Sequence, residues 1–204
     1  MNPDSKLRRF RGVVMPYAGH SSIRAVKRAG HEPSIHGTKL WKSSCLIIDY
    51  LKKNPPKRRK RVLDAGCGWG ITGIWCAKHW DSKVISMDAD AAVFPYLDAV
   101  AELNGVSTKS WVQRFEKVRK KDLEKVDILF GGDICFWDEM AEQLLRLIGR
   151  AKRAGVRHVL IADPCRPPFT DLSMNCEQKF ENVELVTKFL RRPVRASGEI
   201  LIVS

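Results

Sequence analysis

Short apolar runs alternate with longer amphipathic segments along most of this 204-residue chain. The runs predict β-strands, and the segments, whose apolar residues recur at helical spacing, predict α-helices. The predicted strands are 62–64, 84–88, 111–112, 127–133, 156–162, 183–190 and 199–203. The predicted helices are 22–28, 43–52, 71–80, 90–104, 137–153 and 173–181. This order predicts an α/β fold with a doubly wound, mainly parallel seven-stranded sheet.

Local signals mark the ends of several predicted helices. Ser43 or Ser44 can cap the helix that follows them, and an Asn-Pro-Pro sequence from Asn54 ends it. Gly105 is placed to end the helix at 90–104. The chain therefore divides into elements of ordinary length.

A glycine-rich turn joins the first predicted strand to its helix. Glycines let the backbone come close to a ligand, and the first N–H groups of the helix point at it. The turn begins with Asp64 and contains Gly66, Gly68 and Gly70. This Asp-x-Gly-x-Gly-x-Gly pattern is typical of S-adenosylmethionine-dependent methyltransferases.

The same turn also contains the dinucleotide fingerprint Gly-x-Gly-x-x-Gly, between Gly68 and Gly73. That frame matches less well, because its first glycine should follow the strand directly, where Gly66 stands. A glycine-rich turn that binds nothing is the third alternative.

Four aspartates lie at the ends of predicted strands, the edge where ligands bind in a parallel sheet. They are Asp64, Asp88, Asp133 and Asp163. Asp88 stands twenty residues after Gly68, where an acid at the tip of the second strand holds ribose hydroxyls. Asp64 suits a ligand that carries a cation, such as S-adenosylmethionine. These strand ends predict the binding edge.

Composition narrows the class of protein. A single domain accounts for 204 residues and leaves little room for the separate substrate domain of a dehydrogenase. No apolar run approaches the roughly eighteen residues of a membrane span, and the first residues lack the apolar core of a signal peptide. The six cysteines show no zinc-site spacing, so we expect reduced thiols and a cytoplasmic location.

The net charge of +13 favours an acidic partner, which is nucleic acid, an acidic protein face or an anionic surface, with plain solubility as the alternative. Residues 1–36 are basic and predict an extension or lid before a methyltransferase domain at 37–204, with a loosely ordered tail as the alternative. No acid or cysteine stands at ligand spacing from the histidines of this segment, so we expect no metal site. The basic run 57–61 predicts a solvated loop, with a nuclear-localisation or nucleic-acid patch as the alternative.

Three further stretches, together with the glycine turn, resemble segments of a known protein family. They are 37–41 (Gly-Thr-Lys-Leu-Trp), 132–136 (Gly-Asp-Ile-Cys-Phe) and 159–169 (Val-Leu-Ile-Ala-Asp-Pro-Cys-Arg-Pro-Pro-Phe). With the glycine turn, they make residues 37–204 similar to the class I, seven-β-strand S-adenosylmethionine-dependent methyltransferases. Within that class the chain resembles the protein-lysine methyltransferase group that includes the electron-transfer flavoprotein β-subunit lysine methyltransferase. Trp69 and Cys165 depart from the pattern, since relatives often have smaller residues there.

The resemblance implies a Rossmann-like sheet whose last strand is antiparallel, with S-adenosylmethionine as the cofactor. The implied cofactor-binding residues are Trp41, Asp64, Gly66, Gly68, Gly70, Asp88 and Asp133. Of these, Asp88 would hold the ribose, and Asp64 would act indirectly. The implied catalytic residues are Asp133, facing the acceptor nitrogen, and Phe136, shaping its channel. Asp163 and Arg166 would line the same rim, and residues 113–116 would border the adenine.

The implied reaction is methyl transfer to a lysine amine of an acidic protein. RNA or a small molecule is the alternative acceptor; the positive charge suits RNA, although no Asn-Pro-Pro-Tyr-type motif follows the fourth predicted strand. A non-catalytic cofactor-binding protein is the third alternative.

Overall fold

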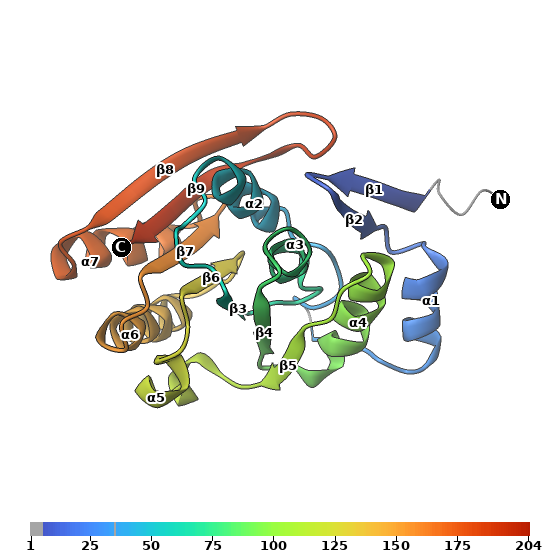
Figure 1. The fold of residues 1–204 in the computed structure, drawn as a ribbon, viewed down its shortest axis with the longest axis horizontal. Helices are drawn as coiled ribbons and strands as arrows, with labels where there is room; N and C mark the ends of the chain where they lie inside the picture. The colour runs from blue at the N-terminus through green and yellow to red at the C-terminus, as the bar shows by residue number, and fades with distance from the viewer. Residues whose placement is uncertain (1–5, 35) are drawn as a thin grey trace.

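A seven-stranded sheet lies at the centre of the computed structural model, which describes residues 6–34 and 36–204. Residues 1–5 and 35, part of the predicted N-terminal extension, lie outside the described residues. The strands are β3 (Arg61–Ala65), β4 (Lys83–Asp88), β5 (Lys109–Val112), β6 (Ile128–Gly132), β7 (His158–Asp163), β8 (Val183–Leu190) and β9 (Ala196–Val203). They lie in the order β5-β4-β3-β6-β7-β9-β8 (Figure 1). The five strands β5 to β7 in this order run parallel, and β9 is antiparallel to both its neighbours, as predicted.

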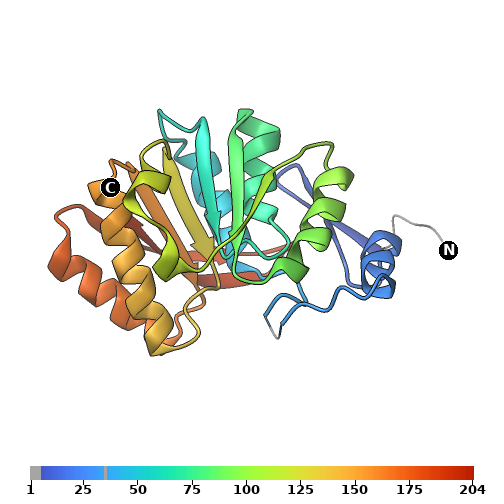
Figure 2. The ribbon, with the colours of Figure 1, turned by 90° about the horizontal axis from the view of Figure 1, so that it is seen from below.

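Helices cover both faces of the sheet (Figures 1 and 2). One face carries α2 (Ser43–Lys53), α3 (Ile71–Trp80) and α4 (Phe94–Leu103), and the other carries α5 (Lys120–Leu123), α6 (Asp138–Arg153) and α7 (Pro167–Lys179). Short 3-10 helices precede α4 and α5, namely η2 (Ala91–Val93) and η3 (Phe115–Lys117). Successive residues of a strand face opposite sides, so Val62 belongs to the core under α2 and α3 while Leu63 belongs to the core under α6. This explains why the central strands are apolar throughout.

The described N-terminal residues form part of the core under α2 and α3. Strands β1 (Leu7–Phe10) and β2 (Val13–Pro16) pair as an antiparallel hairpin, and α1 (Ser21–Arg28) follows. Val13 and Ile23 are fully buried. The side chain of Asn104 binds both the N–H and the carbonyl of Val14, at 2.8 and 2.9 Å. The loosely ordered tail is therefore wrong for the described residues of this segment, and the role of a lid stays a prediction.

The predicted start of α7 and the predicted cap of α2 are wrong. α7 begins at Pro167, six residues before the predicted start at Ser173, because proline is tolerated in the first turn, where its missing N–H has no helical partner. Neither Ser43 nor Ser44 caps α2. Instead, the N–H of Ser43 donates to the carboxylate of Asp133, at 2.9 Å. The cap of α2 thus comes from the end of β6.

The described residues contain no helix that is both long and apolar enough to cross a membrane. All six cysteines are free thiols, and five of them are buried.

Candidate active site

A cavity of about 410 Å³ opens at the carboxyl ends of β3, β4 and β6. Its volume lies in the range of small-molecule sites, about 300–1,000 Å³. Its lining includes Gly66, Gly68, Asp88, Gln113, Asp133 and Phe136. Residues from five separate stretches of the chain, within 34–41, 66–68, 88–93, 113–116 and 132–143, therefore meet at the edge where parallel sheets bind ligands.

The glycine turn forms one wall of this cavity. Gly66 has a φ of +64°, and a Cβ built there would lie 2.6 Å from the side chain of Ile134. Gly68 has a φ of +50°, and a Cβ there would meet nothing within 4 Å, because this residue faces open space. The first glycine is therefore required by packing, and the second leaves the backbone accessible to a ligand.

Asp88 closes β4 and faces the cavity. Its two carboxylate oxygens accept the N–H groups of Gly68 and Asp90, at 3.0 and 3.1 Å. Burial raises the pKa of Asp88, and these two backbone N–H groups oppose the shift. Each oxygen keeps a lone pair for a ligand hydroxyl.

Asp64 lies beneath the glycine turn and does not line the cavity. Its carboxylate accepts the N–H of Gly73, in the first turns of α3, at 3.1 Å. Burial raises the pKa of Asp64 to about 8, with the charge of Asp88 acting in the same direction. These contacts give Asp64 a role in joining β3 to α3. Its predicted indirect role toward a cofactor stays a prediction.

The loop after β5 forms another wall of the cavity. Gln113, Arg114, Phe115 and Glu116 all line the cavity. The N–H of Gln113 donates to the carbonyl of Asp88, at 2.9 Å, which ties this loop to β4. On the other side, Arg150 of α6 donates from Nη2 to the carbonyl of Phe115, at 2.6 Å. Arg150 therefore fixes the position of the loop, a role that its place in an amphipathic helix did not indicate.

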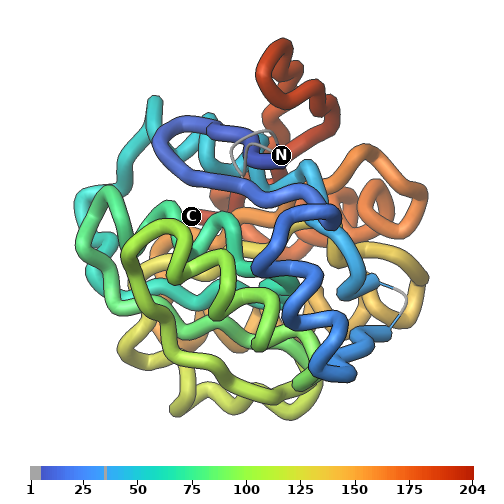
Figure 3. Tube along the Cα trace, turned by 90° about the vertical axis from the view of Figure 1, so that its right-hand side faces the viewer, coloured from blue at the N-terminus to red at the C-terminus, as the bar shows by residue number. Residues whose placement is uncertain are grey.

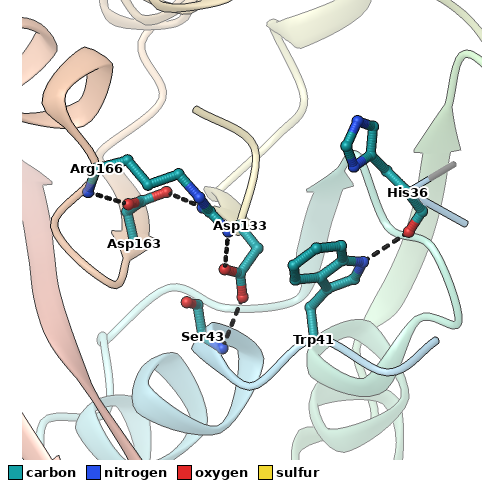
Figure 4. A network of polar contacts seen from close by, with 6 residues as sticks. All are labelled: His36, Trp41, Ser43, Asp133, Asp163 and Arg166. Atoms are coloured by element: carbon teal, nitrogen blue, oxygen red, sulfur yellow. Dashed lines mark hydrogen bonds and ion pairs between the residues drawn. The ribbon is translucent and has the colours of Figure 1, made fainter. Parts of the chain in front are cut away.

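Asp133 lies at the far end of the cavity, directly after β6. Its φ of +58° is in the left-handed region, which aspartate tolerates better than most residues. Its N–H donates to the carbonyl of Ala162, and its carboxylate accepts from Ser43 on one oxygen and Arg166 on the other (Figure 4). The side chain is only 5% exposed. Asp133 is therefore held in one orientation from three sides.

Arg166 links two carboxylates at this end. Its guanidinium donates to Asp133 at 3.0 Å and to Asp163 at 2.6 Å (Figure 4). Burial raises the pKa of Asp163, and Arg166 opposes the shift. Two carboxylates and one guanidinium leave one net negative charge when both acids are ionised. Neither Asp163 nor Arg166 lines the cavity, so the predicted rim position of both is replaced by a supporting position behind Asp133.

Aromatic rings surround the opening next to Asp133. Phe136 stacks on His36 with 3.9 Å between ring centroids, and meets Trp41 edge-on at 5.3 Å. The indole N–H of Trp41 donates to the carbonyl of His36, at 2.6 Å (Figure 4). Trp137 closes the group and is 53% exposed. Burial and the charge of Arg166 lower the pKa of His36, so the ring is neutral near pH 7.

The structure brings most of the predicted site residues together. The cavity is lined by Trp41, Gly66, Gly68, Asp88, Asp133 and Phe136. Gly70 begins α3 and, like Asp64, is not among the lining residues. Sequence reasoning missed His36, Trp137 and Arg150 as site residues; the aromatic pair at 136–137 was an available signal for Trp137. The described part of the chain holds no group of three or more His, Cys, Asp or Glu side chains that could bind a metal.

A family model described as lysine methyltransferase matches residues 25–182, more than half of the chain. The chain belongs to this family. The match includes the glycine turn and both Asp88 and Asp133, and it confirms the resemblance to lysine methyltransferases. It begins within α1, twelve residues before the domain start predicted at residue 37.

Individual lysine methyltransferases are similar over part of their length. The electron transfer flavoprotein beta subunit lysine methyltransferase of Mus musculus is 30% identical over 146 residues, 71% of this chain and 56% of the relative. The calmodulin-lysine N-methyltransferase of Arabidopsis thaliana is 28% identical over 125 residues, 56% of this chain and 41% of the relative. The chain thus spans about half the length of the curated relatives it matches.

Solved structures share the fold of this family member. The human methyltransferase 10 domain containing protein superposes with a TM-score of 0.60 over 89% of this chain and 96% of that one, at 15% identity. The METTL16 methyltransferase domain superposes with a TM-score of 0.63 over 99% of this chain and 87% of that one, at 14% identity. These likenesses confirm the predicted Rossmann-like methyltransferase fold.

Proposed function

We propose that the chain is an S-adenosylmethionine-dependent methyltransferase that acts on a lysine amine of a protein. The observation that carries the proposal is that one cavity is lined by both Asp88 and Asp133. The first carboxylate suits the hydroxyls of a ribose, and the second suits an acceptor amine. A cofactor and an acceptor could therefore meet in the same enclosed space. Membership of the lysine methyltransferase family supports this function.

The residues on the cofactor side fit S-adenosylmethionine. Gly68 leaves open space beside the backbone, and Asp88 has oxygen lone pairs free for ribose hydroxyls. The loop 113–116, which Arg150 holds, would border the adenine. When bound, this cofactor supplies an electrophilic methyl group on a positively charged sulfur.

The residues on the acceptor side fit an alkylammonium group. A lysine amine has an unperturbed pKa of about 10.4 and arrives protonated. Asp133 attracts the ammonium, and Phe136 and Trp41 form an aromatic wall beside it. The amine must lose its proton to water before it can form a bond to carbon. Asp133, fixed by Ser43 and Arg166, then orients the neutral nitrogen, while the aromatic rings exclude water.

A protein is the acceptor class that the relatives' names support, since one names a flavoprotein subunit and another names calmodulin. We propose that the protein is acidic, because the chain carries a net charge of +13. The cytoplasmic location stays a prediction from the sequence.

The test is transfer of a labelled methyl group from S-adenosylmethionine to the contents of a lysate of the native cells. Parallel samples are treated with protease or with nuclease after the reaction, and the Asp88→Ala variant is the background control. We expect the label in macromolecules, lost after protease and kept after nuclease. Label that only nuclease removes would make the acceptor RNA. Normal cofactor binding without labelling of any fraction would indicate a non-catalytic binder.

A further inference from the structure

Two hollows lie between the β1–β2 hairpin and the connection from β8 to β9. The first, of about 270 Å³, is lined by Arg8, Lys39, Trp41, Lys42 and Val194 among others. The second, of about 490 Å³, is lined by Arg9, Arg11, Lys53, Arg191 and Arg192 among others. Residues that are adjacent in sequence line the two hollows: Arg8 and Val194 line the first, and Arg9 and Pro193 line the second. Because Trp41 also lines the active-site cavity, the first hollow adjoins the aromatic opening beside Asp133.

The β8–β9 connection reaches this place because its hairpin is longer than the neighbouring strand. Asp163, the last residue of β7, pairs with Glu199 of β9. The pairing of β8 with β9 continues beyond that point to Leu190 and Ala196. The connection therefore extends past the end of β7, at the sheet edge that carries Asp133. Figure 3 shows it, in red, standing beside the N-terminal hairpin, in blue.

Positive charge dominates the walls of both hollows. The residues that line the two hollows include eight lysines and arginines and one carboxylate. The one carboxylate of the second hollow, Asp49, is buried and already paired with Arg11, Lys53 and Lys188, at 2.6, 3.1 and 3.5 Å. Other cations, on β1 and at the tip of the β8–β9 hairpin (Arg191 and Arg192), remain available to a partner. Within residues 6–34 and 36–204, no carboxylate forms an ion pair with Arg9, Arg191 or Arg192.

An aromatic side chain accompanies these cations. Phe189 lines the second hollow and is 78% exposed, the largest exposed fraction among the exposed large apolar residues that the structure describes. Aromatic and arginine side chains are the residue types most enriched at the energetic centres of protein interfaces. The combination therefore suits a protein segment that carries both acidic and apolar residues.

We propose that this basic face, made of β1, residues 39–42 and 188–194, docks an acidic segment of the acceptor protein. Such docking would place a lysine near that segment at the aromatic opening next to Asp133. The proposal rests on the function proposed above, since it takes the acceptor to be a protein.

The aromatic rings of this face favour protein over RNA. Single-stranded nucleic acid is held by successive uncovered aromatic faces on which bases stack. Here Arg8 lies over the ring of Tyr17, at 4.8 Å, and Lys39 lies over Trp41, at 4.1 Å. Phe189 is left as the uncovered ring in the walls of the second hollow.

The test compares two charge reversals of equal size. Arg191→Glu with Arg192→Glu changes the tip of the basic face. Lys57→Glu with Arg58→Glu makes the same change in the exposed loop before β3, at the opposite edge of the sheet. The probes, read by fluorescence anisotropy, are a lysine-centred peptide flanked by glutamates, its glutamine counterpart and a single-stranded oligouridylate. The milder pair Arg191→Gln with Arg192→Gln serves as a second variant should the reversal disturb folding.

We expect the glutamate peptide to bind more tightly than the glutamine peptide, with an affinity that falls as salt rises. Reversal at the tip should weaken this binding about tenfold or more at low ionic strength, and reversal in the loop less than about twofold. Equal weakening by both reversals would reduce the effect to net charge and overturn the proposal. Tighter, tip-dependent binding of the oligouridylate would overturn it in favour of a nucleic-acid surface.

Two further measurements separate this proposal from the proposed function. S-adenosylmethionine affinity, read by calorimetry, should be the same in all variants, because none of the four substituted positions lines the active-site cavity. Methyl transfer that is normal and unaffected by substitution of Arg191 and Arg192 would overturn the docking proposal and leave the proposed enzymatic function standing. Peptide binding that depends on Arg191 and Arg192, in a chain that transfers no methyl group, would support the docking proposal and contradict the proposed enzymatic function.

Discussion

Arg166 holds Asp133 through a 3.0 Å hydrogen bond between the guanidinium and a carboxylate oxygen, although the two residues are 33 positions apart. The other oxygen of Asp133 accepts the first N–H of α2, from Ser43. A carboxylate held between a guanidinium and a helix N-terminus is oriented before any acceptor arrives. Its geometry is therefore a property of the fold, and its role can be tested by a change that keeps the shape.

Asp133→Asn keeps the size of the side chain and removes its charge. We expect methyl transfer to fall by about a hundredfold or more, the lower range of what a positioned acid or base group supplies. Cofactor affinity should change little, because Asp88 and the glycine turn are untouched. Single-turnover transfer with saturating cofactor, together with calorimetry, measures both. The matched control is Asp171→Asn, on the exposed side of α7. Near-normal transfer would remove Asp133 from the reaction.

Asp88→Ala removes the carboxylate from the cofactor end. A hydrogen bond to a charged group contributes about 1.5–3 kcal/mol, so S-adenosylmethionine affinity should fall on the order of ten- to a hundredfold. Calorimetry of the variant and of an exposed control, Asp98→Ala on α4, gives the comparison. Unchanged affinity in a folded variant would show that Asp88 does not hold the ribose.

Arg150→Met removes the side chain that holds the carbonyl of Phe115. Without it, the loop that lines the cavity loses its tether to α6, and cofactor affinity should fall by up to about tenfold. The melting temperature should change little, because the buried Nε of Arg150, which has no hydrogen-bond partner among the described residues, is removed with the bond. Arg146→Met, on the exposed face of the same helix, is the control. A loss of stability that matches the loss of affinity would point to a general packing defect.

Asp64 makes stability depend on pH. Burial raises the pKa of Asp64 to about 8, whereas an unfolded aspartate has a pKa of about 3.9. Between these values the folded chain binds more protons than the unfolded chain, so the free energy of unfolding falls as pH rises. From pH 6.5 to 8 we expect Asp64 to account for a fall of about 1–2 kcal/mol.

Asp64→Asn should flatten this dependence. The window begins at pH 6.5 because His36 and His158, whose pKa values are lowered, titrate below it. Urea unfolding of both proteins at the two pH values isolates Asp64 from the other buried acids and thiols, which both proteins share. The same slope in both proteins would mean that Asp64 is ionised in the folded state.

Features set by local sequence were predictable. The glycine turn, the apolar central strands and the acids at their ends depend on residues adjacent in the chain. A departure from the family pattern also has a local explanation. Cys165, where the resemblance implies a smaller residue, adopts a φ of +72°, the left-handed conformation that glycine favours. The loop shape is thus kept despite the side chain.

Features set by contacts between distant residues were not predictable. Ser43 looked like a cap, but the cap is a carboxylate 90 positions away. Arg150 lies in a helix of ordinary amphipathic pattern, and only the fold brings it to the carbonyl of Phe115. The burial of Val13 and Ile23 depends on where α3 and α4 lie, so the basic composition of the first segment concealed its place in the core.

The most direct test of the account is titration calorimetry of the unmodified chain with S-adenosylmethionine, its demethylated product and NAD. All three carry an adenosine whose ribose could meet Asp88, but the proposed function gives the cavity between Asp88 and Asp133 to the methionine end of the first two. We expect one saturable site for S-adenosylmethionine and for its product, each displacing the other, and no measurable binding of NAD. Tight binding of NAD with no response to S-adenosylmethionine would contradict it.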